Sequence, residues 1–287
     1  NKNFGKMSIS SNLGFIAGPA LAGLLGATVY KELLPVLAAL LISLAALVVI
    51  FLYLPDSRPK SFSEDPEKAS LKKVLGFEHK ECFKIKDEQK ISLKKCFKLP
   101  DVPYLLILYF LIFLGFNFFY TAFPIHALEK LGWSVSEMGI FFSVLSLIMV
   151  IVQGPVLSFA SKRYSETNLI VYGNLILGTN FVMLYSSNTV LIYIAAVLFA
   201  LGNGLMWPSL LSLLSKAAGD KYQGSVQGFA SSFGSLASII GLIAGGVLYA
   251  KTGAGTFIIA ASVIYLVCFL SLRLYGVEKA IKLKTAE

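Results

Sequence analysis

The chain has 287 residues, of which 56% are hydrophobic and 14% are charged, and its mean hydropathy is +0.74. A soluble domain carries about 25% charged residues, so this composition excludes intrinsic disorder and disfavours a soluble enzyme of the ordinary type. The formal charge of +9 would indicate a nucleic-acid partner in a soluble protein, unless the positions of the basic residues explain it otherwise.

Long apolar segments recur along the chain, and each is long enough to cross the roughly 30 Å hydrocarbon layer as a helix of about 20 residues. The sequence therefore predicts an all-α polytopic membrane protein. Ser134 and Glu137 have capping-box spacing just before one segment. The eight expected transmembrane helices cover 8–29, 33–54, 104–128, 138–160, 168–186, 189–215, 224–250 and 255–275.

The charged residues lie between these segments, and successive loops are alternately rich and poor in basic residues. All but three of the 25 basic residues lie on one side of the expected membrane, and the exceptions are Lys31, Lys130 and Lys251. The positive-inside rule makes the basic side cytoplasmic, with both ends of this chain there. This topology indicates a multi-pass protein of the cell (inner or plasma) membrane, and no nucleic-acid partner is needed to explain the charge.

Segment 55–103 is basic, carries twelve of the 25 basic residues, and is too long to be a turn. Short amphipathic helices at the inner membrane face and a solvated linker explain it equally well. His79, Cys82 and Cys96 lack a fourth ligand, so reduced thiols are the favoured interpretation over a metal site. We expect neither a metal nor a cofactor.

An internal repeat links the first and seventh expected helices. Residues 18–25 match 241–248 at an offset of 223, and both stretches are rich in small residues that allow close helix packing. Because the two copies are the first and seventh helices, one repeat unit has six helices. Two units predict a twelve-helix protein, of which this chain is about two thirds. We expect 1–54 to be the last two helices of an N-terminal half, 55–103 the cytoplasmic central loop, and 104–287 the complete C-terminal six-helix half.

The first expected helix resembles the antiporter motif of the major facilitator superfamily, in its drug:proton antiporter branch, which includes the tetracycline-resistance pumps. That motif reads Gly, eight residues, Gly, three residues, Gly-Pro, two residues, Gly-Gly. Stretches 199–208 and 223–228 are also similar to this family. The resemblance implies that the eight expected helices of this chain correspond to helices five to twelve of the family, and that the protein exports its solute. The matching positions are Gly5, Gly14, Gly18, Pro19, Ala22 and Gly23, with Ala22 replacing one glycine.

The family's gate loop departs from its pattern here. Stretch 158–166 has Lys162 where an aspartate belongs, followed by Arg163, and serines replace both glycines. We therefore expect the inner gate of this half to depend on packing rather than on charge pairing.

Polar side chains within the spans mark candidate contacts of a solute cavity, because a buried polar group in hydrocarbon needs a partner. Asn117 and Tyr120 share one face of 104–128, and Asn203 and Trp207 share a face of 189–215. The resemblance implies that these two helices line a central cavity. Amide bonding between helices is the alternative. The candidate cavity residues are Asn117, Tyr120, Thr121, Gln153, Asn203, Trp207 and Gln227.

The spans contain neither Asp, Glu nor Lys, although proton-coupled pumps need a titratable group within the membrane. His126 is a candidate proton carrier, but it lies near the outer end of its helix. We expect the main coupling acid in helices upstream of this chain.

The favoured function is a secondary transporter that moves a small organic solute by alternating access, with proton-coupled efflux favoured over uptake. The expected partners are the lipid bilayer, a small-molecule solute and the proton, with the protein working as a monomer. The alternatives are an uptake or metabolite carrier of the same superfamily and a non-transporting receptor or scaffold with this fold. An enzyme is disfavoured because the spans carry neither a nucleophile–base–acid set nor clustered carboxylates.

Overall fold

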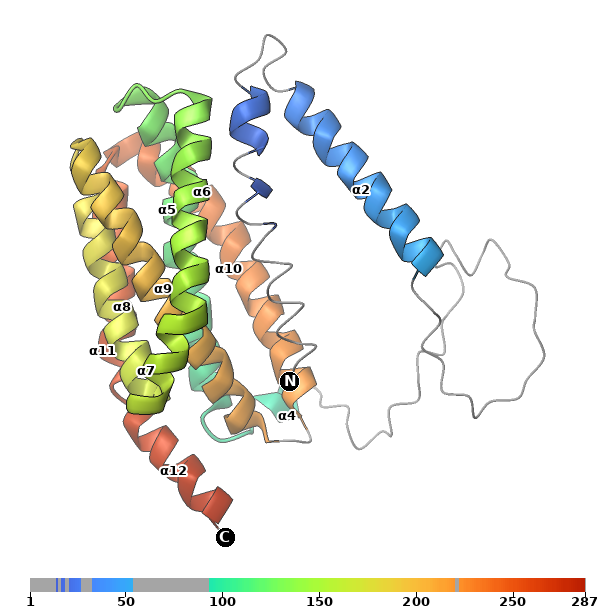
Figure 1. Cartoon of the computed structure of the whole chain (residues 1–287). Helices are drawn as coiled ribbons and strands as arrows, with labels where there is room; N and C mark the ends of the chain where they lie inside the picture. Colours follow the sequence, from blue (N-terminus) through green and yellow to red (C-terminus); the bar gives the residue numbers. More distant parts are fainter. Residues whose placement is uncertain are drawn as a thin grey trace.

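The computed structural model describes residues 14, 17–18, 21–26, 33–53, 93–219 and 222–286. Every regular element within these ranges is a helix, which confirms the all-α prediction (Figure 1). The elements in chain order are α2 (Leu33–Tyr53), α4 (Leu93–Cys96), α5 (Val102–Glu129), α6 (Val135–Ile151), η2 (Val152–Val156), α7 (Leu157–Arg163), α8 (Glu166–Met183), α9 (Thr189–Ala218), α10 (Gln223–Thr252), α11 (Gly255–Ser271) and α12 (Leu274–Ala286).

Helices α2, α5, α9 and α10 and the continuous run α6–η2–α7 are each long and apolar enough to cross a membrane. The bent pair α11 and α12 forms a further candidate span, and α8 is an 18-residue helix packed between α9 and α11. Seven of the eight expected spans thus correspond to helices. Of the expected span 8–29 the structure describes only residues 14, 17–18 and 21–26, which are helical, and most of 55–103 lies outside the described residues, so the count of eight stays a prediction.

The expected single helix 255–275 is wrong at its end, because α11 stops at Ser271 and α12 starts at Leu274 with a bend of 43°. The Leu272 and Arg273 N–H groups donate three residues back, to Phe269 and Leu270, which tightens the turn. Beyond the bend, the buried Glu278 carboxylate accepts a hydrogen bond from the Thr167 N–H at the start of α8 (3.2 Å). The negative side chain suits the positive end of α8, so this contact holds α12 in its bent direction.

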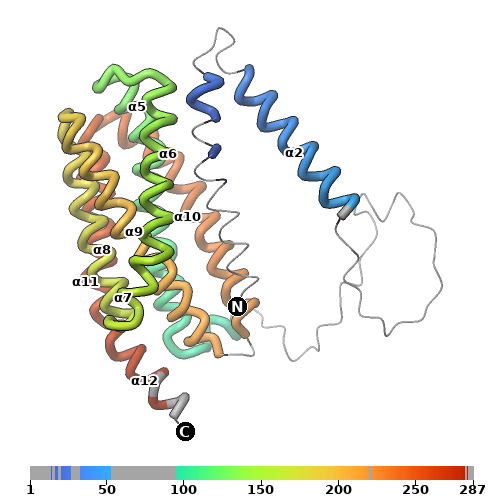
Figure 2. The backbone as a smooth tube through the Cα atoms, viewed as in Figure 1, coloured from blue at the N-terminus to red at the C-terminus, as the bar shows by residue number. Residues whose placement is uncertain are grey.

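The bundle is held by close helix pairs, of which α8–α9, α5–α10 and α8–α11 have the most extensive contacts (Figure 2). At the α8–α9 crossing, a Cβ atom added to Gly202 would lie 2.7 Å from the Gly173 carbonyl oxygen and 2.8 Å from the Leu177 nitrogen. Only glycine permits this approach, which is how membrane helices pack without a hydrophobic driving force between them.

The capping box expected at Ser134 and Glu137 is present, with each side chain bonded to the backbone N–H of the other residue. It fixes the start of α6, and α6 forms one wall of the cavity described below.

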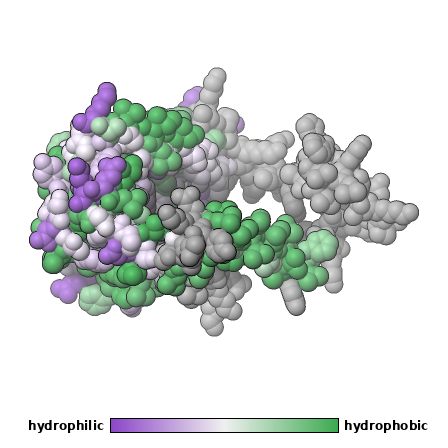
Figure 3. All heavy atoms as spheres, turned by 90° about the horizontal axis from the view of Figure 1, so that it is seen from above, coloured by the Kyte–Doolittle hydropathy of each residue, from purple (hydrophilic) through white to green (hydrophobic). Residues whose placement is uncertain are grey.

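Seen along the bundle, hydrophilic side chains gather on the end face, and apolar side chains cover the flanks and α2 (Figure 3). The hydrophobic window of α2 is 0% buried, with leucine, valine and isoleucine exposed along its length. This distribution is that of a protein whose sides face lipid.

Candidate functional site

A cavity of about 580 Å³ lies among α5, α6, η2, α9 and α10. Its volume is within the range of sites that hold small organic ligands. None of the lining residues that the structure describes is charged, and its walls combine aromatic, amide and hydroxyl groups. The lining residues are Phe113, Phe116, Asn117, Tyr120, Phe142, Leu145, Ser146, Met149, Val150, Gln153, Asn203, Trp207 and Ser238.

Helix α5 contributes Phe113, Asn117 and Tyr120, which recur at i, i+4 and i+7 and therefore share one helix face. The Asn117 side-chain nitrogen, Nδ2, donates to the Phe113 carbonyl oxygen (2.7 Å) and to Ser238 Oγ of α10 (3.0 Å). A Cβ atom added to Gly241 would lie 2.7 Å from the Asn117 Cβ. This close approach of α10 to α5 brings Ser238 within reach of the amide.

Gln153 reaches the cavity from η2, a π-helical turn that contains Pro155. Proline has no N–H and its ring clashes with the preceding turn, and a wider π turn is one way for a helix to continue through it. Gly204 of α9 faces this turn, since an added Cβ atom there would lie 2.6 Å from Val152 Cγ1. The absence of a side chain at Gly204 therefore leaves room for the π turn that carries Gln153.

Helix α9 supplies Asn203 and Trp207 on adjacent turns. The Trp207 ring lies 5.0 Å from the Tyr109 ring and 5.2 Å from the Phe113 ring, which themselves stack at 5.0 Å. These three rings form an aromatic cluster (Tyr109, Phe113, Trp207) at one side of the cavity. Asn203 Nδ2 lies 3.9 Å from Met149 Sδ, a weak contact, so within the described part of the chain most of the amide's hydrogen-bonding capacity is open to a ligand.

Five of the seven candidate residues line this one cavity, namely Asn117, Tyr120, Gln153, Asn203 and Trp207. The structure does not bring the other two to it. Thr121 donates to the Asn117 carbonyl oxygen (2.9 Å) and packs against Gly245 of α10, and Gln227 is exposed on α10.

Sequence reasoning missed Ser146, Ser238, Phe142 and Met149 as lining residues. Serines are common on both packed and cavity-facing sides of membrane helices, so only the position relative to the Asn117 face could have singled out Ser238.

The profile of the Major Facilitator Superfamily matches this chain over 1–153 and 105–286, which together include nearly all of it. The chain belongs to the Major Facilitator Superfamily. This confirms the resemblance found in the sequence, and it makes the chain a multi-pass membrane protein of a transporter family rather than an enzyme.

Two relatives illustrate the similarity. The chain is 29% identical over 251 residues to Multidrug resistance protein 1 of Bacillus subtilis, covering 86% of this chain and 58% of the relative. It is 26% identical over 276 residues to the class C tetracycline resistance protein of Escherichia coli, covering 95% and 65%. The chain thus spans between 58% and 65% of the length of these relatives.

A solved structure supports the fold alone. The human organic anion transporter MFSD10 (TETRAN) aligns with a TM-score of 0.53 at 22% identity, covering 60% of this chain and 40% of that chain.

Of the family's antiporter motif, Gly5 and Pro19 lie outside the described residues. Among the described residues, nothing lies within 4 Å of a Cβ atom added to Gly14 or Gly18. Gly23 is buried, and an added Cβ atom would lie 2.9 Å from the Gly139 Cα of α6. Ser136 Oγ also donates to the Gly23 carbonyl oxygen (3.2 Å), so this motif glycine contacts the start of α6 closely.

His126 is buried in the last turn of α5, away from the cavity. Its Nδ1 lies 3.2 Å from the Tyr249 hydroxyl of α10, and its ring forms a T-shaped pair with the Phe257 ring of α11 (5.3 Å between centroids). Its Nε2 is buried without a hydrogen-bond partner in the described structure. The structure therefore places this candidate proton carrier at a junction of three helices and not beside the solute cavity.

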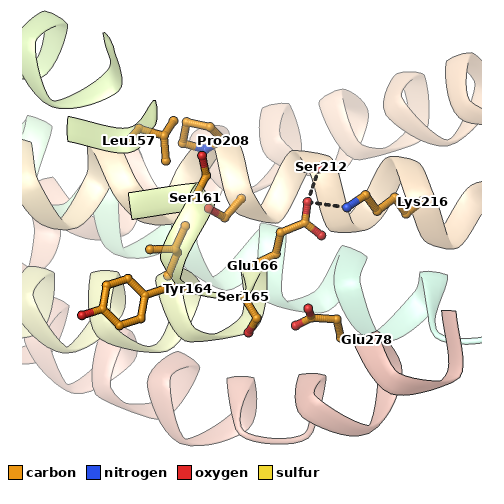
Figure 4. A pocket seen from close by; sticks show the side chains of 11 residues that line it. Leu157, Ser161, Tyr164, Ser165, Glu166, Pro208, Ser212, Lys216 and Glu278 are labelled. Atoms are coloured by element: carbon orange, nitrogen blue, oxygen red, sulfur yellow. Dashed lines mark hydrogen bonds and ion pairs between the residues drawn. The ribbon is translucent and has the colours of Figure 1, made fainter. Parts of the chain in front are cut away.

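The gate-loop residues Lys162 and Arg163 are exposed at the end of α7. Next to them lies a second pocket of about 410 Å³, rich in hydroxyl groups, into which Glu166 of α8 projects (Figure 4). Glu166 Oε1 accepts from Ser212 Oγ and lies 2.8 Å from Lys216 Nζ of α9. Sequence reasoning missed this ion pair, because Glu166 and Lys216 are fifty residues apart and neither lies in a recognisable pairing motif.

Proposed function

We propose that this chain is the solute-binding part of a secondary transporter that exports a small amphipathic organic compound by alternating access. The observation that carries the proposal is the uncharged cavity of about 580 Å³ among α5, α6, η2, α9 and α10, whose walls are aromatic rings and amides. Such walls suit a solute that has an apolar body and a few hydrogen-bonding groups. Transporters of this type bind solute near the bilayer midplane between two halves that rock about it.

Export is supported by the names of the two relatives, which describe multidrug and tetracycline resistance, and by the Gly5–Gly23 motif. We further propose that a proton gradient drives it. The described cavity lining is uncharged, so we place the main coupling acid in helices upstream of this chain, and His126, on α5 but away from the cavity, is the candidate proton carrier within it.

The proposed topology places both ends of the chain and segment 55–103 in the cytoplasm, in a protein that functions as a monomer in the cell membrane. The concentration of basic residues on one side supports this orientation. In this arrangement 1–54 ends the N-terminal half, and 104–287 is the C-terminal six-helix half with α5 as its first helix.

The test is an accumulation assay with the complete gene product in a bacterial host that lacks its own exporters. Expression should lower the cellular content of at least one planar aromatic dye from a panel. An uncoupler that abolishes the proton gradient should restore that content. The Trp207→Ala variant, at equal abundance in the membrane, should accumulate dye as the empty vector does. Ser262→Ala is the matched control, because Ser262 is exposed on α11 and its hydroxyl donates to the Ile258 carbonyl oxygen of its own helix.

Dye content above that of the empty vector would instead identify an uptake carrier. Unchanged content across the whole panel would contradict export, and lower content that persists with the uncoupler would contradict proton coupling.

A further inference from the structure

The orientation of the Asn117 side-chain amide is fixed by its neighbours. One of its terminal atoms lies 2.7 Å from the Phe113 carbonyl oxygen, which can only accept a hydrogen bond. That terminal atom must therefore be the nitrogen, since an oxygen there would meet another oxygen. The same nitrogen lies 3.0 Å from Ser238 Oγ, so both of its hydrogens have acceptors.

The side-chain oxygen of Asn117, Oδ1, is available to accept a hydrogen bond from a ligand. Asn117 lines the cavity and is 8% exposed, and Oδ1 accepts from no group in the part of the chain that the structure describes. It is also not among the polar atoms that are fully enclosed without a partner. Since turning the amide over would replace the bond to the Phe113 carbonyl oxygen with a contact between two oxygens, Oδ1 is a fixed acceptor on the cavity wall.

The apolar surroundings of Oδ1 increase its influence on which ligands bind. Aromatic side chains of α5, α6 and α9 line the cavity around it, and the described lining offers no charged group. A ligand that brings no donor would displace water from Oδ1 and leave it unpaired, which costs binding energy, whereas a ligand with a donor restores the bond.

We propose that Asn117 selects, among uncharged planar aromatic solutes, those that carry a hydrogen-bond donor (a hydroxyl or an N–H group). The donor would bond to Asn117 Oδ1 while the aromatic body contacts the rings of Phe113 and Trp207. This proposal rests on the proposed function, because it assigns the solute class to the same cavity.

The test uses three fluorescent coumarin probes that differ at one position, which carries a hydroxyl, an amino or a methoxy group. Equilibrium binding to the purified complete gene product in detergent is measured by the change in probe fluorescence. The hydroxyl and amino probes should bind about three- to tenfold more tightly than the methoxy probe, which is the size of one net hydrogen bond. The amino probe tests whether a second kind of donor is also preferred, and the Asn117→Leu variant separates the loss of a donor from the added bulk of the methyl group.

The Asn117→Leu variant should bind the three probes with affinities that differ less than twofold. Asn203→Leu is the matched control, because it removes another cavity amide but leaves the Asn117 acceptor in place. It should weaken binding of all three probes and keep the donor preference. If Asn117→Leu does not fold, the affinities of the wild-type protein for the three probes still test the proposal.

Equal affinity of the wild-type protein for all three probes would overturn the acceptor proposal and leave the cavity as the solute site. Donor preference that persists in folded Asn117→Leu would also overturn it. Binding of none of the probes would overturn the assignment of the cavity itself, and the acceptor proposal with it.

Discussion

Neighbouring residues of α9 have opposite surroundings. Gly202 faces α8, where backbone atoms approach so closely that no side chain fits. Asn203 faces the cavity, with Trp207 one turn further along the same helix. The α8–α9 contact is therefore the packed face, defined by Gly173, Leu177 and Gly202, and the cavity wall is the open face, defined by Asn203 and Trp207. The comparison shows how one membrane helix can be anchored rigidly to its neighbour and still present side chains to a solute.

The packed face should be the more sensitive to added volume. In Gly202→Ala, the new methyl group would meet the Gly173 oxygen and the Leu177 nitrogen at under 3 Å, and both atoms belong to the backbone. We expect a loss of about 1–3 kcal/mol in the free energy of unfolding, because overpacking forces the helices apart. A thermal unfolding curve of the purified protein in detergent measures it.

The matched control is Gly228→Ala on α10, where no described residue lies within 4 Å of an added Cβ atom. This variant should unfold at or above the wild-type temperature, since alanine favours a helix by roughly 1 kcal/mol over glycine. Equal unfolding temperatures for the two variants would show that the α8–α9 contact is not tightly packed.

The rate at which a cysteine is alkylated also distinguishes enclosed positions from open ones. Burial raises the pKa of the Cys96 thiol, which lies at the end of α4 and is fully enclosed. Its reactive thiolate therefore forms only at a higher pH than in a free cysteine. A cysteine introduced as Asn203→Cys on the open face should be alkylated by iodoacetamide faster than Cys96 at pH 8.

The gap between the two rates should narrow as the pH rises, because Cys96 gains thiolate at the upper end of the range. Mass spectrometry of the alkylated peptides measures both sites in one sample. Faster labelling of Cys96 than of the introduced thiol would contradict the burial of Cys96.

The smallest effect is expected at the end of the packed face, where Glu166 pairs with Lys216. The side chains are 22% and 56% exposed, so solvent and salt screen the attraction. We expect Glu166→Gln to cost less than about 1 kcal/mol of stability. A double-mutant cycle with Lys216→Met measures the coupling, and a value well above this would show that the pair lies in a less polar environment than its exposure indicates.

Much of the fold was predictable because membrane helices leave a direct signal, a run of apolar residues of bilayer length. The shared face of Asn117 and Tyr120 and the pair Asn203 and Trp207 followed from helical spacing alone. The bend between α11 and α12 was not predictable, because it depends on Glu278 meeting Thr167 more than a hundred residues away. The π turn at Gln153 likewise depends on Gly204 of another helix.

The roles of individual polar side chains were the least predictable feature. Thr121 and Tyr120 are adjacent in sequence, yet only Tyr120 lines the cavity. Asn117 and Asn180 are both amides within helices, yet Asn180 donates to the Ala195 carbonyl oxygen (2.5 Å) and joins α8 to α9. Which interaction an amide makes depends on the neighbouring helix, and one sequence does not specify that neighbour.

The central claim, that the open face of α9 binds solute, is tested most directly by tryptophan fluorescence. A planar aromatic solute that the protein exports should quench the emission of the purified complete gene product in a saturable manner. The quenching should disappear in Trp207→Phe and persist in Trp133→Phe, because Trp133 packs against Phe123, Phe141 and Tyr193 outside the cavity. Saturable quenching of equal size in Trp207→Phe and in the wild-type protein would contradict the claim.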